Sequence, residues 1–158
     1  MTTTLTAATM TVTLTEAITL NGYDQGSKNT LTIDSVTEVS KRIVTVTTTE
    51  AVIATFSAAI GAGNYIAADV KYMRFANLDD TNFITLTFRN QDNDEVAIKL
   101  DAGNSFMWFA DNSGGMVDVF NATEDADAAS STNFGSLTNI QADANSGSCI
   151  LEYFIASV

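Results

Sequence analysis

The sequence predicts an all-β fold, an antiparallel β-sandwich of the jelly-roll kind that carries one short helix. Three observations support this prediction: apolar and polar residues alternate along much of the chain, threonine is overused in the first fifty-seven positions, and turn-forming residues separate the alternating runs. Alternation with a period of two places the apolar side chains on one face of a strand, and β-branched threonine favours the extended backbone. Roughly eight to ten such runs are expected, which favours two packed sheets.

The first half of the chain predicts several strands. Apolar residues alternate with threonine from residue 10 to residue 20, after which Asn21-Gly22 predicts a turn. Further strands are expected around residues 30–34, 44–46 and 51–56. The sequence Gly-Ala-Gly-Asn at 61–64 then marks a break that lets the chain cross between sheets. It does not predict a dinucleotide site, because neither a helical pattern nor a third glycine follows it.

The second half alternates more regularly. Strands are predicted at residues 70–76, 84–88 and 96–100, with short turns between them. Connections of roughly four residues predict that these three strands are consecutive antiparallel neighbours. The aromatic run at 106–109 predicts a strand that is apolar on both faces.

The last part of the chain predicts the one helix and a closing hairpin. Asn121 is suited to cap a helix and Glu124 to complete a capping box, which predicts a helix of at most two turns over 122–129. Residues 137–144 and 148–156 are expected to pair as a hairpin across the turn at 145–147.

The domain organisation expected from the sequence is simple. Residues 1–9 are uncharged and rich in threonine and alanine, which predicts an extended N-terminal arm that either frays or adds a strand to a neighbouring subunit. No Pro-rich or Gly/Ser-rich linker divides the remainder, so residues 10–158 are expected to form a single β-sandwich domain.

Composition excludes several classes of function. The 158 residues include no histidine, no proline and one cysteine, so a Ser-His-Asp or Cys-His relay, a His-ligated metal and a disulfide framework are all excluded. The net charge of −12 disfavours binding to nucleic acid or to an anionic membrane. We therefore expect no enzyme activity, no cofactor, no metal, and no catalytic or cofactor-binding residues. No secretory signal and no apolar run of roughly 20 residues is evident either.

A few residues were weighed as candidate sites. Carboxylates two positions apart are a pattern that binds calcium, but Asp and Asn also stabilise turns. A pair of carboxylates is also the machinery of glycoside hydrolysis. With nineteen acids in the chain, however, any such pair is weak evidence for that activity. We interpret all three acidic clusters as turn or helix-start residues: Asp92, Asp94 and Glu95; Asp79, Asp80 and Asn82; Glu124, Asp125 and Asp127.

The aromatic and sulfur side chains have their own expected places. Trp108 lies between Met107 and Phe109 and is expected in the core, whereas Tyr23 and Tyr65 are the candidates for exposed sugar-stacking aromatics. Cys149 is expected to be a small buried side chain, and Arg74 is a possible ion-pair partner of Glu152, the lone charge of the last strand.

Four segments of the chain carry a resemblance to a known group. In chain order they are KRIVTVTTTEAVIATFSAAIGAG, ADVKYMRFANLDDTNFITLTFRN, EVAIKLDAGNSFMWF and LEYFIASV. Together they resemble small virion structural proteins of tailed bacteriophages, marine phages in particular. The resemblance covers roughly two-thirds of the chain, and its motifs are strand and turn motifs that specify no reaction.

This resemblance implies a role in the virion, which assembles in the host cytoplasm. Its first implication is a capsid decoration, or cement, protein that binds the major capsid protein, stabilises the phage head and forms a homo-oligomer, with a trimer as the first expectation. The alternatives are a tail or fibre component, with tail proteins as partners, or a carbohydrate-binding adhesion module. A chain of 158 residues leaves no room for a receptor-binding module beyond one sandwich.

Overall fold

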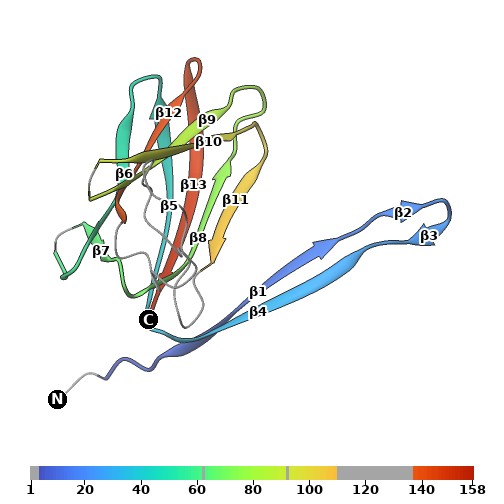
Figure 1. The fold of residues 1–158 in the computed structure, drawn as a ribbon, viewed down its shortest axis with the longest axis horizontal. Coiled ribbons are helices and arrows are strands. Elements are labelled where there is room, and N and C mark those ends of the chain that lie inside the picture. Colours follow the sequence, from blue (N-terminus) through green and yellow to red (C-terminus); the bar gives the residue numbers. More distant parts are fainter. Residues whose placement is uncertain (1–3, 62, 92, 110–136) are drawn as a thin grey trace.

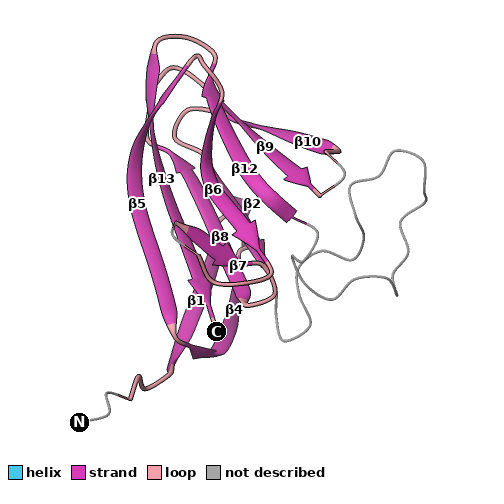
Figure 2. Cartoon of the chain, turned by 90° about the vertical axis from the view of Figure 1, so that its left-hand side faces the viewer, coloured by secondary structure: helices cyan, strands magenta, loops and turns pink. Residues whose placement is uncertain are grey.

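The fold is all-β, as predicted. A computed structural model describes residues 4–61, 63–91, 93–109 and 137–158, and within these residues it contains thirteen strands and no helix. Figure 2 shows strands, turns and loops throughout the described chain. The helix predicted over 122–129 lies outside the described residues.

Nine strands build a sandwich of two sheets (Figure 1). The four-stranded sheet has the order β11-β8-β13-β5, with bounds Ser105–Phe109, Val70–Asn77, Ser148–Ser157 and Glu38–Thr47. The five-stranded sheet has the order β10-β9-β12-β6-β7, with bounds Glu95–Leu100, Ile84–Asn90, Leu137–Ala144, Ala51–Ser57 and Asn64–Ile66. All neighbouring strands pair antiparallel except β6 and β7, which are parallel.

The chain passes repeatedly from one sheet to the other. The predicted pairing of β9 with β10 is confirmed, but β8 and β9 lie in different sheets, and so do β12 and β13. The predictions of a continuous run of neighbours from 70 to 100 and of a closing hairpin at 137–156 were therefore wrong. Both connections are arches between sheets. They are tied together because the Asn145 N–H donates to the carbonyl of Phe83, and the Phe83 N–H donates to the side-chain oxygen of Asn145.

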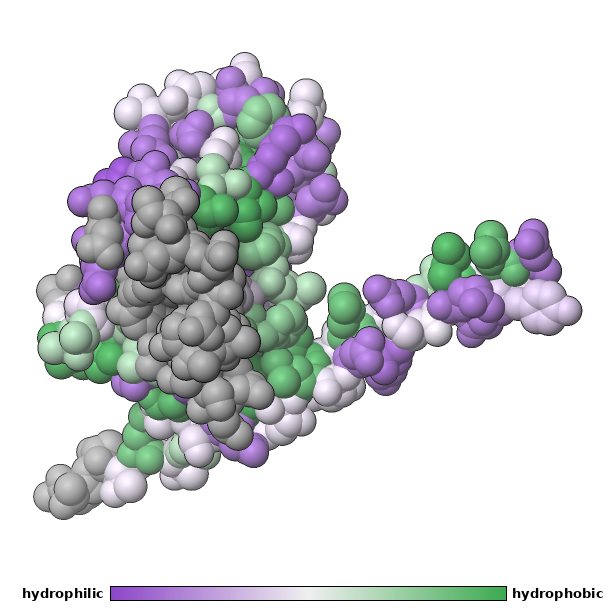
Figure 3. Space-filling view, in the orientation of Figure 1, coloured by the Kyte–Doolittle hydropathy of each residue, from purple (hydrophilic) through white to green (hydrophobic). Residues whose placement is uncertain are grey.

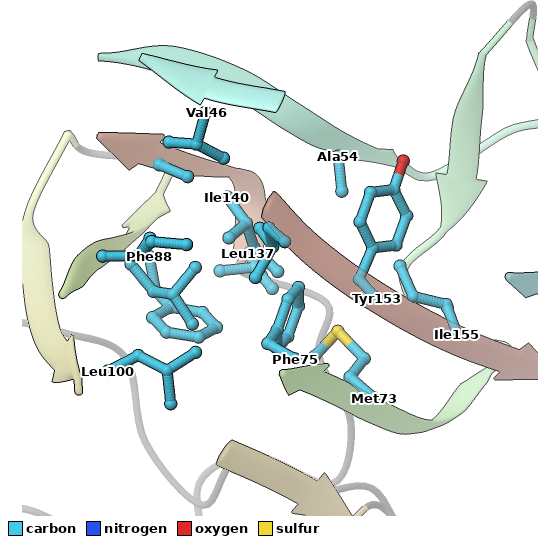
Figure 4. Close-up of a cluster of buried hydrophobic side chains, with 14 of the residues drawn as sticks. Val46, Ala54, Met73, Phe75, Phe88, Leu100, Leu137, Ile140, Tyr153 and Ile155 are labelled. Atoms are coloured by element: carbon cyan, nitrogen blue, oxygen red, sulfur yellow. The ribbon is translucent and has the colours of Figure 1, made fainter. Parts of the chain in front are cut away.

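The core fills the space between the two sheets (Figure 4). Phe75 from β8 and Phe88 from β9 are fully buried and meet edge to face, with ring centroids 6.1 Å apart. Trp108 packs against Phe88 at 5.1 Å, which confirms its expected place in the core. Tyr153 is 1% exposed, and its hydroxyl is satisfied by donating to the carbonyl of Ile53 at 3.1 Å.

A long hairpin projects from one end of the sandwich (Figure 1). From here on, 'the arm' means this hairpin, residues 8–36, which shares only residues 8 and 9 with the N-terminal arm predicted at residues 1–9. Strand β1 (Ala8–Glu16) pairs antiparallel with β4 (Ser27–Val36), and the short strands β2 (Thr19–Leu20) and β3 (Tyr23–Asp24) pair at the tip. The predicted turn at Asn21-Gly22 is confirmed, and both residues have positive φ, as a tight hairpin turn requires. Residues 10–36 were expected in the sandwich; their strands instead form two separate two-stranded sheets, β1-β4 and β2-β3.

Replacing Phe75 with alanine tests the aromatic centre of the core. We expect F75A to lower the free energy of unfolding by about 3–5 kcal/mol, because it removes a fully buried ring and leaves a cavity. Val52→Ala, at a side chain that is 55% exposed, is the control and is expected to change stability by less than about 0.5 kcal/mol. Urea denaturation followed by tryptophan fluorescence measures both, and equal effects would contradict the assignment of the core.

Candidate docking surface

The base of the arm packs on the outer face of the four-stranded sheet. Arm residues and sheet residues together form a second, smaller apolar cluster, whose buried members are Ile33, Val36, Tyr72 and Ala156. Tyr72 and Ala156 are opposite each other on β8 and β13, and the ring of Phe154 lies 5.8 Å from that of Tyr72. The cluster is completed by partly buried side chains of the arm and of β13: Met10, Val12, Leu31 and Phe154.

The two faces of the arm differ in chemistry. In the register of β1 with β4, Met10 pairs with Ile33 and Val12 with Leu31, so these apolar side chains share the face that contacts the sandwich. The opposite face pairs Thr11 with Thr32 and Thr13 with Thr30. Threonine favours the strand conformation while it keeps a hydroxyl in water, so this face suits solvent.

The apolar character of the arm continues beyond the part that the sandwich covers. Leu14 is 43% exposed, and at the tip Ile18, Leu20 and Tyr23 are 56%, 59% and 74% exposed. Figure 3 shows hydrophobic residues gathered at the far end of the arm, well away from the sandwich. Tyr23 is therefore exposed, as the sequence predicted. An isolated two-stranded hairpin is only marginally stable in water, and these side chains at the tip are exposed in the described structure.

Beside the base of the arm, the outer face of the four-stranded sheet carries a trio of charges. Glu152 accepts a hydrogen bond from the guanidinium of Arg74, and its other carboxylate oxygen lies 3.0 Å from Nζ of Lys41. The ion pair between Arg74 and Glu152 that the sequence suggested is thus present. Hydrogen bonds from Arg74, and next from Lys41, hold the pKa of Glu152 below the usual glutamate range.

A shallow groove of about 380 Å³ separates these charges from the arm. Its apolar walls come from Met10, Val12, Tyr72 and Phe154, and its cationic side from Lys41 and Arg74. The side chain of Lys41 is 56% exposed, and Lys41 and Arg74 share the single carboxylate of Glu152, so the trio keeps one excess positive charge. The groove therefore combines apolar surface with positive charge, on a chain whose net charge is −12.

A second pocket, of about 510 Å³, lies at the edge of the sandwich beside β5 and β7. Arg42, Asp69, Asn64 and Tyr65 are among its lining residues. The expectation that Tyr65 is an exposed loop residue was wrong: it lies in β7 and is partly buried, its ring packs 5.7 Å from that of Phe56, and its hydroxyl donates to Ser40.

The acidic turns are structural, as interpreted from the sequence. Asp79 accepts hydrogen bonds from the backbone N–H groups of Asn82 and Thr81, and these bonds lower its pKa. Asp94 bonds to the side chain of Asn90, and Glu95 forms an ion pair with Arg89. No cluster of three or more metal-ligating side chains occurs among the residues that the structure describes. Asp92 and the cluster of Glu124, Asp125 and Asp127 lie outside them.

Cys149 is fully buried, which confirms its expected role as a core side chain. Burial, and next the negative charge of Asp79, raise the pKa of its thiol. A higher pKa keeps the thiol protonated at neutral pH, and the protonated thiol is a poor nucleophile.

Comparison with known proteins returned no matching family model, curated protein or solved structure. In the described ranges, no helix has the length and apolar character required to cross a bilayer.

Sequence reasoning missed the main feature of this surface, which is that the apolar face of the arm is only half covered. The signal was present in the alternation of Met10, Val12 and Leu14 and in the apolar pair Leu20 and Tyr23 around the Asn-Gly turn. The same pattern also suits a strand of the sandwich, so spacing alone did not separate the two possibilities.

Replacing Glu152 with glutamine tests the charge trio. We expect E152Q to lower the free energy of unfolding at neutral pH by about 1 kcal/mol, because Arg74 and Lys41 lose their shared carboxylate. Folding depresses the pKa of Glu152, so its contribution is complete above the unfolded-state pKa and disappears as the pH falls through the folded-state pKa. The difference between wild type and E152Q should therefore shrink on acidification.

Urea denaturation over a pH series measures this difference. Glu95→Gln is the matched control, since Glu95 also pairs with an arginine but its side chain is 41% exposed, against 14% for Glu152. The control is expected to cost less than about 0.5 kcal/mol. A cost for E152Q that does not change with pH would contradict the role of its carboxylate.

Proposed function

We propose that this protein is a non-enzymatic structural protein of a virion, and specifically a capsid decoration protein that binds the major capsid protein and stabilises the head of a tailed bacteriophage. It acts there as a homo-oligomer and joins particles assembled in the host cytoplasm. The observation that carries the proposal is the arm, because a hairpin that projects from a rigid sandwich and exposes Ile18, Leu20 and Tyr23 is a device for binding another protein.

The order of the strands supports this proposal. When β5, β6 and β8 to β13 are numbered one to eight along the chain, one sheet has the order 1-8-3-6 and the other 2-7-4-5, with β7 added at an edge. This is the order of an eight-stranded jelly roll, an architecture found in viral capsid and lectin domains. The jelly roll that the sequence suggested is therefore part of the proposal.

Charge supports it as well. A decoration protein has to remain dispersed before it binds its shell, and a net charge of −12 makes the copies repel one another in solution. The sandwich supplies the rigidity, since its largest core side chains, such as Phe75, Phe88 and Tyr153, are almost completely buried.

Cryo-electron microscopy of the source particle tests the proposal. We expect density for the sandwich and its arm on the outer surface of the head, at positions that bridge capsid subunits. Density on the tail alone would overturn the decoration role and leave the alternative of a tail or fibre component. A matched particle from which this protein has been removed is the control, and it should lose the density and withstand less heating.

A second candidate function, carbohydrate binding, is favoured by the pocket beside β5 and β7. Arg42, Asp69 and Asn64 line it together with the ring of Tyr65, and sugar sites combine such hydrogen-bonding groups with an aromatic side chain. A glycan array tests this function. Binding that is lost in Asp69→Ala and kept in the control Asp101→Ala, an acid on the other side of the sandwich, would support it. The absence of binding to any glycan on the array would exclude it.

A further inference from the structure

The tip of the arm and the groove beside its base are two complementary surfaces of one chain. The tip is apolar and acidic: residues 16–26 include Ile18, Leu20 and Tyr23 and the acids Glu16 and Asp24, while Lys28 lies across from Thr15 at the inner end of the tip. The groove is apolar and cationic, with Tyr72 and Phe154 in its wall and Lys41 and Arg74 along its side. Their apolar parts and their charges therefore match.

The tip does not reach the groove of its own chain. The groove lies where Met10 and Val12 of the arm contact Tyr72 and Phe154 of the sandwich, at the base of the arm. Strands β1 and β4 then run outward to the tip, which Figure 1 shows projecting far from the sandwich. The hairpin holds the tip away from the groove of its own chain. The tip of one molecule can therefore contact only the groove of another molecule.

The free edge of β5 is a less suitable place for the arm. This ten-residue edge strand carries Lys41 and Arg42 in its middle, and charged residues on an edge strand discourage the addition of further strands. The outer face beside it offers apolar contacts in addition to charge. This favours a contact between side chains in the groove over backbone pairing at the edge.

We propose that the tip of the arm binds in the groove of a second copy of the same chain. Leu20 and Tyr23 pack against the apolar wall to which Phe154, Met10 and Val12 contribute, and the acids at the tip face Lys41 and Arg74. This inference rests on the proposed assembly function and names the partner of the arm. The contact joins two different surfaces, so it is head to tail, and a repeated head-to-tail contact closes into a ring where the rotation between copies allows it.

The first experiment measures self-association of the full chain by sedimentation velocity over a concentration series. We expect wild type to associate and the double variant Leu20→Asp with Tyr23→Asp to associate at least about tenfold more weakly, because a central apolar anchor dominates such contacts. The control is Val52→Asp with Ile60→Asp, which adds the same two charges at side chains that are 55% and 86% exposed, and it should behave as wild type.

The second experiment tests the groove with a charge reversal. Lys41→Glu should weaken association, because it repels the acids at the tip. Lys99→Glu is its control: Lys99 is 57% exposed and pairs with Asp101 at 2.7 Å, much as Lys41 is 56% exposed and pairs with Glu152 at 3.0 Å. An equal mixture of the tip variant and Lys41→Glu should recover one-to-one complexes, because one intact tip then meets one intact groove.

The outcomes separate this inference from the proposed function. A wild type that is monomeric at every concentration, a tip variant that associates like its control, or a Lys41→Glu variant that matches Lys99→Glu overturns the inference, even if the protein is found on heads. Association that depends on the tip and the groove supports the inference, even if microscopy finds the protein on no head. Circular dichroism of each variant establishes that it is folded before it is compared.

Discussion

Two adjacent strands, β8 and β13, bury apolar side chains on both of their faces, and the rest of the molecule depends on this constraint. On the inner face, Met73, Phe75, Tyr153 and Ile155 build the core against the five-stranded sheet. On the outer face, Tyr72, Phe154 and Ala156 form the seat for the arm. If the outer face of this sheet were polar, the sandwich would need no further cover. Because the outer face is also apolar, it must be covered, and the base of the arm covers it.

The class of fold was predictable from the sequence, but the pairing of the strands was not. Alternation locates strands because it reflects burial on one face, and the runs at 70–76, 84–88 and 96–100 all became strands. A short connection, however, suits both a hairpin within one sheet and an arch between two. The arches here depend on tertiary contacts, such as the side chain of Asn77 donating to the carbonyl of Leu100 and the N–H of Phe83 donating to the side chain of Asn145. Residues distant in sequence decide such contacts, so local pattern did not reveal them.

The candidate site was predictable only in pieces. The turn at Asn21-Gly22, the exposed Tyr23 and the pairing of Arg74 with Glu152 follow from local chemistry or strand position. The position of the arm outside the sandwich does not follow from local chemistry. In the sequence, an apolar stripe that faces a sheet looks the same whether its strand belongs to that sheet or lies across it. The threonines on the opposite face of both β1 and β4 were the available clue, since matched polar faces on two strands joined by a tight turn favour a solvated hairpin.

A chain with a net charge of −12 and an exposed apolar tip combines two forces of different range. Charge repulsion acts over the Debye length, about 8 Å at physiological salt, and holds copies apart at random encounters. Apolar attraction acts only on contact and only where two surfaces fit. Lys41 and Arg74 place an excess of positive charge beside the apolar wall of the groove, so in the proposed contact the repulsion between two copies is reduced where the tip meets apolar surface. In the proposed contact, the acidity that keeps copies dispersed therefore also favours the orientation in which the tip of one copy faces the groove of another.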